Sequence, residues 1–316
     1  MALPAGYRIR HPGPRDLRTV AEVVEACEIA DHGVSSFSAD DLEAEWGRPR
    51  FDRRHDAWVV TGPSGRIVGY ASLWQDVAGA EVEAVAYVLP EYGGRGLGGH
   101  LLARIEERTA ALARTAPGPV VVGTFASRAN AAKCDLLERN GYRRAHTMFR
   151  MVGELTRRRR VAVDPPDGIA IRAFRPGIDE ELVHDAMDEA FSGTFRYTPR
   201  PLREWIALQV GHPSFDPDLW LVACDGDKPI GGILAHEAND YAFLSDLGVR
   251  PVWRRRGVAS ALLDRMLSDL KERGTTRVTL TVDGDDPDGV MTLFERAGMR
   301  VAEQHDWYEK VLPPAQ

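Results

Sequence analysis

A short segment rich in glycine and arginine occurs twice in this chain, each time between a strand-like stretch and a strongly helical one. The first copy reads GGRGLG at residues 93–98, and the second reads RRRGVA at residues 254–259. A tight loop before a helix turns several backbone N–H groups toward one point, where the helix dipole also favours negative charge. The two segments therefore predict two phosphate-binding loops in a duplicated domain.

The repetition extends through most of the chain. Trp58 and Trp220 are 162 positions apart, and Gly141 and Gly298, each at the end of a predicted helix, are 157 positions apart. An offset that drifts by only a few residues indicates two copies of one fold that differ by small loop changes. Glycine at such a helix end suits a left-handed C-cap.

The length of 316 residues also exceeds that of one typical domain. Four arginines at residues 157–160, followed by DPPDG at residues 164–168, indicate a turn-forming linker. We expect an N-terminal domain at 1–156, a linker at 157–168 and a C-terminal domain at 169–316. Each domain is expected to be α/β (α+β), with a mixed central sheet flanked by helices and closed by its own last strand.

Composition excludes several classes of function. The net charge of -7 argues against nucleic acid as a partner, since a phosphate binder of that kind needs a basic face. The three cysteines lie far apart and indicate a reducing compartment rather than disulfides or a metal site. The histidines show no metal-binding spacing, and no apolar run approaches ~18 residues. A soluble cytoplasmic protein without a membrane or metal partner is expected.

Family motifs surround both loops. The second loop fits the pattern R/Q-x-x-G-x-G/A, with Arg254, Gly257 and Ala259 at its fixed positions. Downstream of the loops, LLERNGY at residues 136–142 and LFERAGM at residues 293–299 are matching segments. On these motifs the chain resembles the GNAT superfamily of N-acetyltransferases, twice and over nearly its whole length. The resemblance implies two tandem GNAT-like domains packed as an intramolecular pseudo-dimer, with acetyl-CoA (CoA) as the cofactor.

The same resemblance implies which residues bind acetyl-CoA. The loop amides and arginines bind the pyrophosphate and the 3'-phosphate end, and the backbone of the preceding strand binds the pantetheine arm. In the second half these residues are Leu247, Gly248, Val249, Arg254, Arg255, Arg256, Gly257, Val258, Ala259, Ser260 and Asp286. In the first half they are Tyr87, Val88, Arg95, Gly96, Leu97, Gly98, Gly99 and Asn130.

Other phosphate motifs do not fit. Gly94, Gly96 and Gly99 spell G-x-G-x-x-G, but the second loop does not repeat that spacing. No acidic residue ends the next strand to bind a ribose, which a dinucleotide site requires. The chain also has no G-K-[S/T] sequence of the P-loop kind.

Direct acetyl transfer needs a base, because an acceptor ammonium with a pKa of about 10.4 must lose a proton before it attacks. Asp246 lies three residues before Val249 on the central strand, where many GNAT members carry an acid, and it is the preferred base; a local structural hydrogen bond is the alternative. In the first half this position is Val85. Glu83 lies on the same strand face and is the candidate base there.

The hydroxyl that protonates the departing thiolate in many GNAT proteins is absent from its usual place. Leu137 in the first half and Phe294 in the second occupy that position. Tyr308 on the last strand, or water, is the expected substitute.

Three functions therefore remain open from the sequence. The first is acetylation of a primary amine of a small molecule or peptide by direct transfer, with the C-terminal domain active. The second is a mycothiol-synthase-like acetyltransferase, since that family is also a tandem GNAT protein of this size. The third is a catalytically silent protein that binds or senses acyl-CoA, which the missing tyrosines favour. Acceptor pockets in this fold are built from variable loops, so the acceptor is not predicted.

Overall fold

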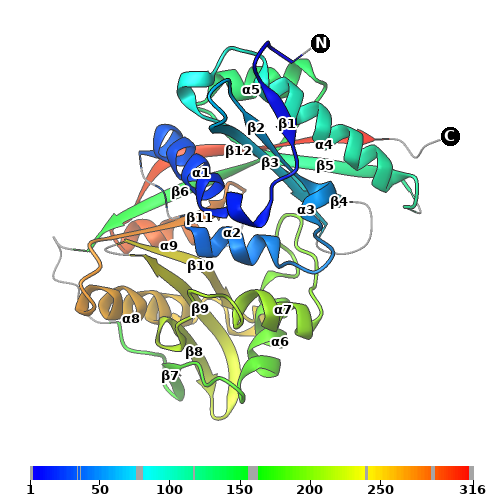
Figure 1. Cartoon of the computed structure of the whole chain (residues 1–316). Helices are drawn as coiled ribbons and strands as arrows, with labels where there is room; N and C mark the ends of the chain where they lie inside the picture. The colour runs from blue at the N-terminus through cyan, green and yellow to red at the C-terminus, as the bar shows by residue number, and fades with distance from the viewer. Residues whose placement is uncertain are drawn as a thin grey trace. The chain divides into compact units, whose positions relative to one another are not determined.

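The computed structural model describes residues 3–33, 35, 37–75, 81–116, 118–155, 163–238, 241–285 and 289–312. Contacts between Cα atoms divide it into an N-terminal unit, Met1–Thr147 with Glu303–Gln316, and a C-terminal unit, Met148–Ala302. Both units are mixed α/β, which confirms the predicted fold class (Figure 1). Within the described ranges, no helix combines the length and the apolarity that crossing a membrane requires.

The sheet of the N-terminal unit has the strand order β1-β2-β3-β4-β5-β12. Its neighbouring strands are antiparallel except for β4 and β5, which are parallel. Helix α1 packs on β3 and β4, and α4 packs on β3, β4 and β5 from the other side (Figure 1). The strands are β1 (Arg8–Arg10), β2 (Ala57–Thr61), β3 (Ile67–Trp74), β4 (Glu81–Val88), β5 (Val120–Ser127) and β12 (Arg300–Leu312). The helices are α1 (Leu17–His32), α2 (Ala39–Trp46), α3 (Arg53–Asp56), α4 (Leu97–Ala113) and α5 (Ala131–Arg139), with 3-10 turns at Pro14–Asp16 and Pro90–Tyr92.

The sheet of the C-terminal unit repeats this plan in the order β7-β8-β9-β10-β11-β6. Here β10 and β11 form the parallel pair, and the other neighbours are antiparallel. The strands are β6 (Arg143–Glu154), β7 (Ile169–Ala173), β8 (Trp220–Asp225), β9 (Lys228–Ala238), β10 (Tyr241–Val249) and β11 (Arg277–Asp283). The helices are α6 (Glu180–Phe191), α7 (Leu202–Gln209), α8 (Val258–Glu272) and α9 (Val290–Arg296), with 3-10 turns at Pro217–Leu219 and Pro251–Trp253.

The last strand of each half differs from the sequence expectation. Residues Met148 to Glu154 of β6 pair with β11 of the second half, and His305 to Leu312 of β12 pair with β5 of the first half. Each half therefore supplies the strand that completes the other half's sheet. This pairing leaves no room for a side chain at residue 123, because a Cβ atom on Gly123 of β5 would lie 1.8 Å from the Trp307 ring of β12. Only glycine at residue 123 accommodates that buried indole.

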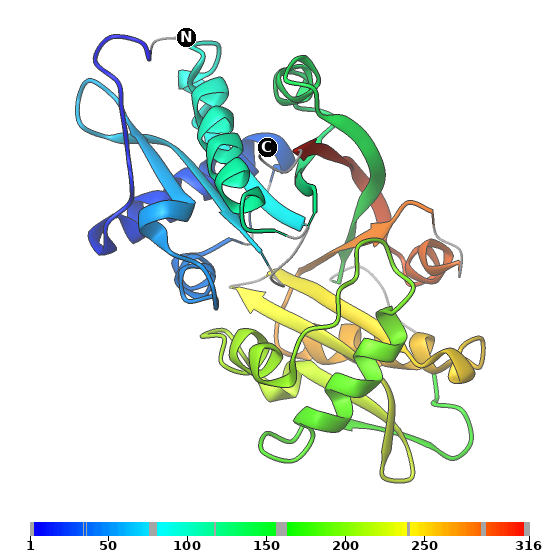
Figure 2. The ribbon, with the colours of Figure 1, turned by 90° about the vertical axis from the view of Figure 1, so that its right-hand side faces the viewer.

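The two faces of the C-terminal sheet bury separate cores. On β9, Ile233 and Ala235 belong to the core beneath α8, whereas Leu234 belongs to the core beneath α6 and α7. This alternation is the period-two pattern of a sheet covered on both faces. Figure 2 shows α6 lying across the yellow strands on the side that faces the viewer. We call this side of the C-terminal sheet the α6 face.

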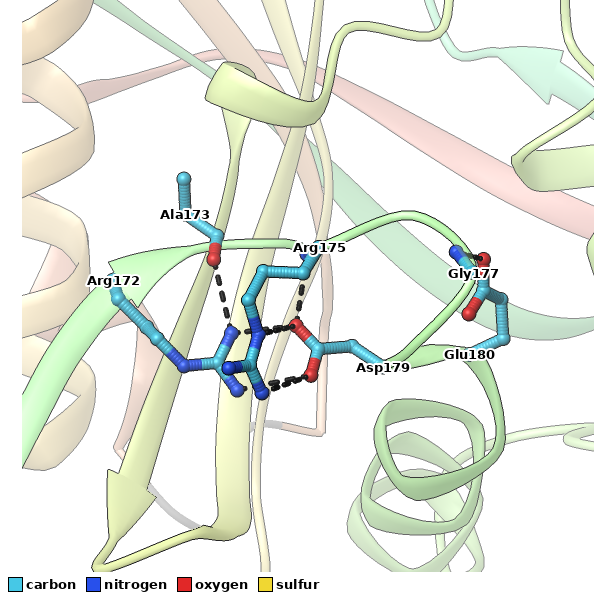
Figure 3. Close-up of polar contacts among 6 residues, drawn as sticks. All are labelled: Arg172, Ala173, Arg175, Gly177, Asp179 and Glu180. Carbon is cyan, nitrogen blue, oxygen red and sulfur yellow. Dashed lines mark hydrogen bonds and ion pairs between the residues drawn. The ribbon is translucent and has the colours of Figure 1, made fainter.

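A charged cluster joins β7 to α6 (Figure 3). Asp179, at the start of α6, accepts hydrogen bonds from Arg172 Nη1 at 2.5 Å and Arg175 Nη2 at 2.9 Å, and its side chain is 1% exposed. Burial acts to raise the pKa of Asp179, but the hydrogen bonds from the two arginines outweigh it and lower that pKa to about 2. The carboxylate thus holds the strand and the helix in a defined geometry. In the N-terminal unit Asp16 makes the corresponding ion pair with Arg10 and also accepts from the Gly13 amide.

Candidate cofactor loops and acceptor face

The two glycine- and arginine-rich loops have nearly the same backbone. Each follows a 3-10 turn and ends at a left-handed glycine that caps the next helix, Gly96 with φ 78° before α4 and Gly257 with φ 90° before α8. Two residues earlier, Gly94 has φ 72° and Arg255 has φ 60°. Both loops therefore begin a helix, whose first amides have no acceptor within the helix itself and suit an anion. The helical residues that follow each loop, Leu97 and Val258, are buried and their side chains belong to the cores of the two units.

The arginines of the loops have different partners. Arg254 donates to the carbonyl of Val249 at 3.2 Å and to the carbonyl of Ala190 at 2.7 Å, so it fastens the second loop to the ends of β10 and α6. The first loop has Gly93 at this position. The third arginine position is alike in the two loops, since Arg95 lies over Tyr92 at 5.1 Å and Arg256 over Trp253 at 4.9 Å.

The parallel strands before each loop separate as they approach it. Among the described residues, β4 pairs with β5 only from Glu81 to Glu83, and β10 pairs with β11 only from Tyr241 to Phe243. Beyond these residues β4 and β10 pair with a strand on one side only. The other edge retains backbone donors and acceptors for an extended ligand. The strand residues predicted to bind pantetheine, Tyr87 and Val88 or Leu247 to Val249, all lie in these separated segments.

Asp246 lies directly after a β-bulge on β10. The register between β9 and β10 shifts between Leu244 and Asp246, which leaves Ser245 as the extra residue. Asp246 pairs with Leu234, so its side chain shares the α6 face. Burial raises the pKa of Asp246 above its ordinary value, while hydrogen bonding with Ser245 and the charge of Arg200 oppose that rise. A carboxylate with a raised pKa at the mouth of the separated strands is a candidate general base.

Further polar and aromatic groups lie on the same side of the unit. The Tyr197 hydroxyl donates to the carboxylate of Asp188 on α6, and its ring stacks on Phe191 with centroids 6.1 Å apart. Arg200 also acts electrostatically on both Tyr197 and Asp246. These residues form the candidate acceptor site of the C-terminal unit.

In the N-terminal unit, Glu83 is the last β4 residue paired with β5, and its side chain is half-buried. The structure adds Glu45 of α2, which the sequence reading did not single out. Burial raises the pKa of Glu45 to about 7; the charge of Arg48 acts against this and that of Glu83 adds to it. Glu45 therefore titrates near neutral pH beside Glu83. No local sequence pattern marks such a residue, because its pKa depends on burial by distant segments.

The three predicted catalytic residues do not belong to one unit, since Glu83 and Tyr308 lie in the N-terminal unit and Asp246 lies in the C-terminal unit. Tyr308 pairs with Thr124 on β5, is buried, and donates its hydroxyl to Glu138 at 3.1 Å. Burial raises its pKa above the usual range, with hydrogen bonding to Cys134 and Glu138 acting in the same direction.

Two residues, Asn130 and Asp286, were predicted at the strand–helix junctions, and the structure describes the first of them. Asn130 caps α5 by accepting from the Lys133 amide at 3.0 Å, and its own amide donates to Asp31 at 3.1 Å. Asp286 lies outside the described residues. The side chain of Lys133 lies over Tyr87, with its Nζ atom 5.7 Å from the ring centroid.

Comparison with known proteins agrees with the two loops and the separated strands. Residues 180–299 match the model of the acetyltransferase (GNAT) family, and residues 53–144 match that of an acetyltransferase (GNAT) domain. The chain belongs to the GNAT family as a two-domain member, and it is an acyltransferase.

Relatives and solved structures match this chain over nearly its whole length. The mycothiol acetyltransferase of Geodermatophilus obscurus is 30% identical over 90% of this chain and 91% of its own length, and that of Catenulispora acidiphila is 29% identical over 89% and 91%. The crystal structure of a GCN5-related N-acetyltransferase from Sphaerobacter thermophilus has a TM-score of 0.81 and 29% identity, covering 100% of this chain and 98% of its own. A tandem GNAT protein from the clavulanic acid biosynthesis pathway has a TM-score of 0.74 at 13% identity, covering 98% and 100%, and so supports the fold alone.

Proposed function

We propose that this protein transfers the acetyl group of acetyl-CoA to a primary amine of a small molecule, and that the C-terminal unit carries out the reaction. The observation that carries this proposal is Asp246, a carboxylate with a raised pKa that follows a β-bulge at the point where β10 leaves β11. The loop with three arginines, which we assign to the cofactor, follows β10 in the chain. The proposal assigns the N-terminal unit a supporting role.

The cofactor fits the residues present. The left-handed backbone at Arg255 and Gly257 directs loop amides toward one point, which suits a pyrophosphate. The edge of β10 that faces away from β9 suits the amides of a pantetheine arm. Acetyl-CoA supplies the activated acetyl group as a thioester.

In this scheme Asp246 takes a proton from the acceptor ammonium, directly or through water. The amine then attacks the thioester carbonyl, the C–N bond forms, the C–S bond breaks, and the surplus proton on nitrogen passes to the thiolate through water. Water takes this part because the expected tyrosine position is Phe294, a buried apolar residue. Loss of a single proton donor of this kind reduces a rate without abolishing it.

The acceptor of the mycothiol acetyltransferases is the first candidate substrate. Such relatives match about nine-tenths of this chain and of their own lengths at about 30% identity. We infer that the acceptor is a hydrophilic amine of the sugar–cysteine kind. The experiment is transfer of labelled acetyl from acetyl-CoA to a sugar–cysteine amine, to simple amino sugars and to a lysine peptide, with Asp246→Asn as the matched variant.

A catalytically silent acyl-CoA-binding protein is the second candidate. Buried Leu137 and Phe294 at the two tyrosine positions favour it. Binding of acetyl-CoA without transfer to any amine in the panel, together with unchanged binding in Asp246→Asn, would establish this alternative.

A further inference from the structure

One of the few lysines of this chain lies at the mouth of the separated strands in the N-terminal unit. Lys133 belongs to α5, the helix that follows β5, and its Nζ atom lies 5.7 Å from the ring centroid of Tyr87 on β4. Tyr87 lies in the segment of β4 where the described pairing with β5 has ended. The lysine side chain therefore extends from the β5 side of this mouth to the β4 side. The chain has 40 lysines and arginines, of which four are lysines: Lys133, Lys228, Lys271 and Lys310.

The Nζ atom of Lys133 lies on the side of the sheet that α1 covers. Its charge interacts with Asp31 and Cys27 of α1, and the neighbouring Tyr87 is acted on by the charges of Glu28 of α1 and Glu45 of α2. Helix α1 packs on β3 and β4 as α6 packs on β9 and β10 of the other unit. The amine therefore lies on the counterpart of the α6 face, where we place the candidate acceptor site of the C-terminal unit.

The surroundings of Lys133 favour a neutral amine at this point. Burial lowers the pKa of Lys133, and the charge of Asp31 acts against that fall. In the part of the chain that the structure describes, no hydrogen bond or ion pair engages its Nζ atom. An arginine at this position would stay charged, whereas a half-buried lysine can lose its proton and act as a nucleophile.

The C-terminal unit has no lysine at the corresponding position. The segments LLERNG at residues 136–141 and LFERAG at residues 293–298 are 157 positions apart, and the same offset aligns Lys133 with Val290. Val290 packs against the core of the C-terminal unit. Gly248 corresponds to Tyr87, since each lies one residue before the end of its strand. An amine beside an aromatic ring at the mouth thus distinguishes the N-terminal unit.

We propose that Lys133 is an internal acceptor, so that acetyl-CoA bound at the N-terminal loop transfers its acetyl group to Nζ of Lys133 in the same chain. The neutral amine attacks the thioester carbonyl, the C–N bond forms and the C–S bond breaks, and the surplus proton on nitrogen passes through water to the thiolate. The products are a chain acetylated at Lys133 and free CoA. This inference rests on the proposed cofactor, acetyl-CoA, and not on the activity of the C-terminal unit.

The first test is incubation of the full chain with an excess of deuterated acetyl-CoA, followed by mass spectrometry of the four lysine sites. Lys133 is expected to gain the label at least about tenfold faster than Lys228 and Lys271, because a bound thioester and a held amine react at a high effective concentration. Lys228 and Lys271 are exposed, so plain chemical acetylation would favour them. The rate per chain is expected to stay constant when the protein is diluted. Labelling that is fastest at the exposed lysines, or that slows with dilution, would overturn the proposal.

Two pairs of variants locate the transfer. Lys133→Arg is expected to lose the fast labelling, and Lys228→Arg, its control at an exposed site, retains it. Gly96→Glu places a carboxylate at the N-terminal loop and is expected to slow the labelling of Lys133 at least about tenfold, whereas Gly96→Ala slows it by less than about threefold. Equal rates in Gly96→Glu and Gly96→Ala would refute delivery from the N-terminal loop.

Failure of the proposed function is separable from failure of this inference. Binding of labelled acetyl-CoA and transfer to the amine panel are measured on the same samples. If acetyl-CoA binds and no external amine is acetylated, fast labelling of Lys133 still supports the inference. If acetyl-CoA binds and Lys133 stays unlabelled, the inference is overturned whether or not external amines are acetylated. A chain that binds no acetyl-CoA would overturn both.

Discussion

The two units share the backbone of their glycine- and arginine-rich loops and differ at the mouth of the separated strands. At this mouth the N-terminal unit has Trp74 paired with Glu83, and Arg48 lies over the Trp74 ring at 4.6 Å. The C-terminal unit has His236 paired with Phe243. Anion binding by a loop depends on backbone amides, so the loop geometry persists in both copies. Recognition of an acceptor depends on side chains, and the side chains at this mouth differ between the two units.

The separated strands themselves also differ. Strand β4 pairs with β3 without interruption from Glu83 to Val88, whereas β10 has a bulge before Asp246. A bulge bends its strand and redirects the side chains around it, and bulges are frequent beside active sites. The C-terminal unit thus has a bulged strand with Asp246 at the position where the N-terminal unit has a regular strand with Val85.

The largest expected difference concerns the loops. Gly257→Glu places a carboxylate and a residue with φ 90° at the pyrophosphate position, so acetyl transfer is expected to fall at least about 100-fold. Gly96→Glu makes the same change in the N-terminal unit and is expected to alter the rate by less than about threefold. The measurement is kcat/KM for acetyl-CoA, with Gly257→Ala and Gly96→Ala as controls for backbone strain. A larger loss in Gly96→Glu would assign the chemistry to the N-terminal unit.

The second comparison concerns the two candidate bases, Asp246 and Glu83. Asp246→Asn is expected to lower kcat by about 100-fold or more, the usual contribution of a general base, whereas Glu83→Gln leaves kcat nearly unchanged. A base acts when ionised, so the rate falls as the pH drops through its pKa. Because burial raises the pKa of Asp246, the acid limb of the profile is expected above the ordinary range for aspartate and is absent in the variant.

The acid limb also tests the N-terminal unit. A limb near pH 7 that disappears in Glu45→Gln would point to Glu45, whose pKa is about 7, and would contradict the assignment to Asp246.

Much of the geometry of the two loops was predictable from the sequence, because short local patterns determine it. The loops start their helices at Gly96 and Gly257 as predicted, and the helix-ending glycines Gly141 and Gly298 have φ 82° and 88°. These features depend on backbone conformations that glycine adopts easily.

The acceptor side and the strand exchange were not predictable in the same way. β6 and β12 occupy equivalent places in the two halves, so no local pattern distinguishes pairing within a half from pairing across halves. Likewise, no local pattern marks Lys133 in the sequence. Only the fold brings its side chain from α5 to Tyr87 of β4.

The third comparison concerns stability. Asp179 accepts from two arginines and is 1% exposed, whereas Asp16 accepts from one and is 18% exposed. The folded pKa of Asp179 is about 2, below the ordinary 3.8, so its contribution is present above pH of about 4 and is lost as the pH falls toward 2. Asp179→Asn is expected to lower the free energy of unfolding by about 2 kcal/mol at pH 7. Asp16→Asn is expected to lower it by less than about 1 kcal/mol.

Urea unfolding at pH 7 and pH 3 measures both effects. The difference between wild type and Asp179→Asn should shrink at the lower pH, because the wild-type carboxylate then loses part of its advantage over the unfolded state. Equal losses of unfolding free energy for the two variants would show that the second arginine adds nothing to the stabilisation by Asp179.

The smallest effect concerns backbone strain at the second position of each loop. Arg255 has φ 60° and Gly94 has φ 72°, so the C-terminal loop places a side chain in a conformation that its counterpart leaves to glycine. Gly94→Arg is expected to destabilise the protein by about 1 kcal/mol, because it places a side chain in the left-handed region. Arg255→Gly is expected to raise the KM for acetyl-CoA, because it removes a charge that attracts the phosphates. An unchanged KM together with a lower melting temperature would instead make this arginine a structural contact, as Arg254 is.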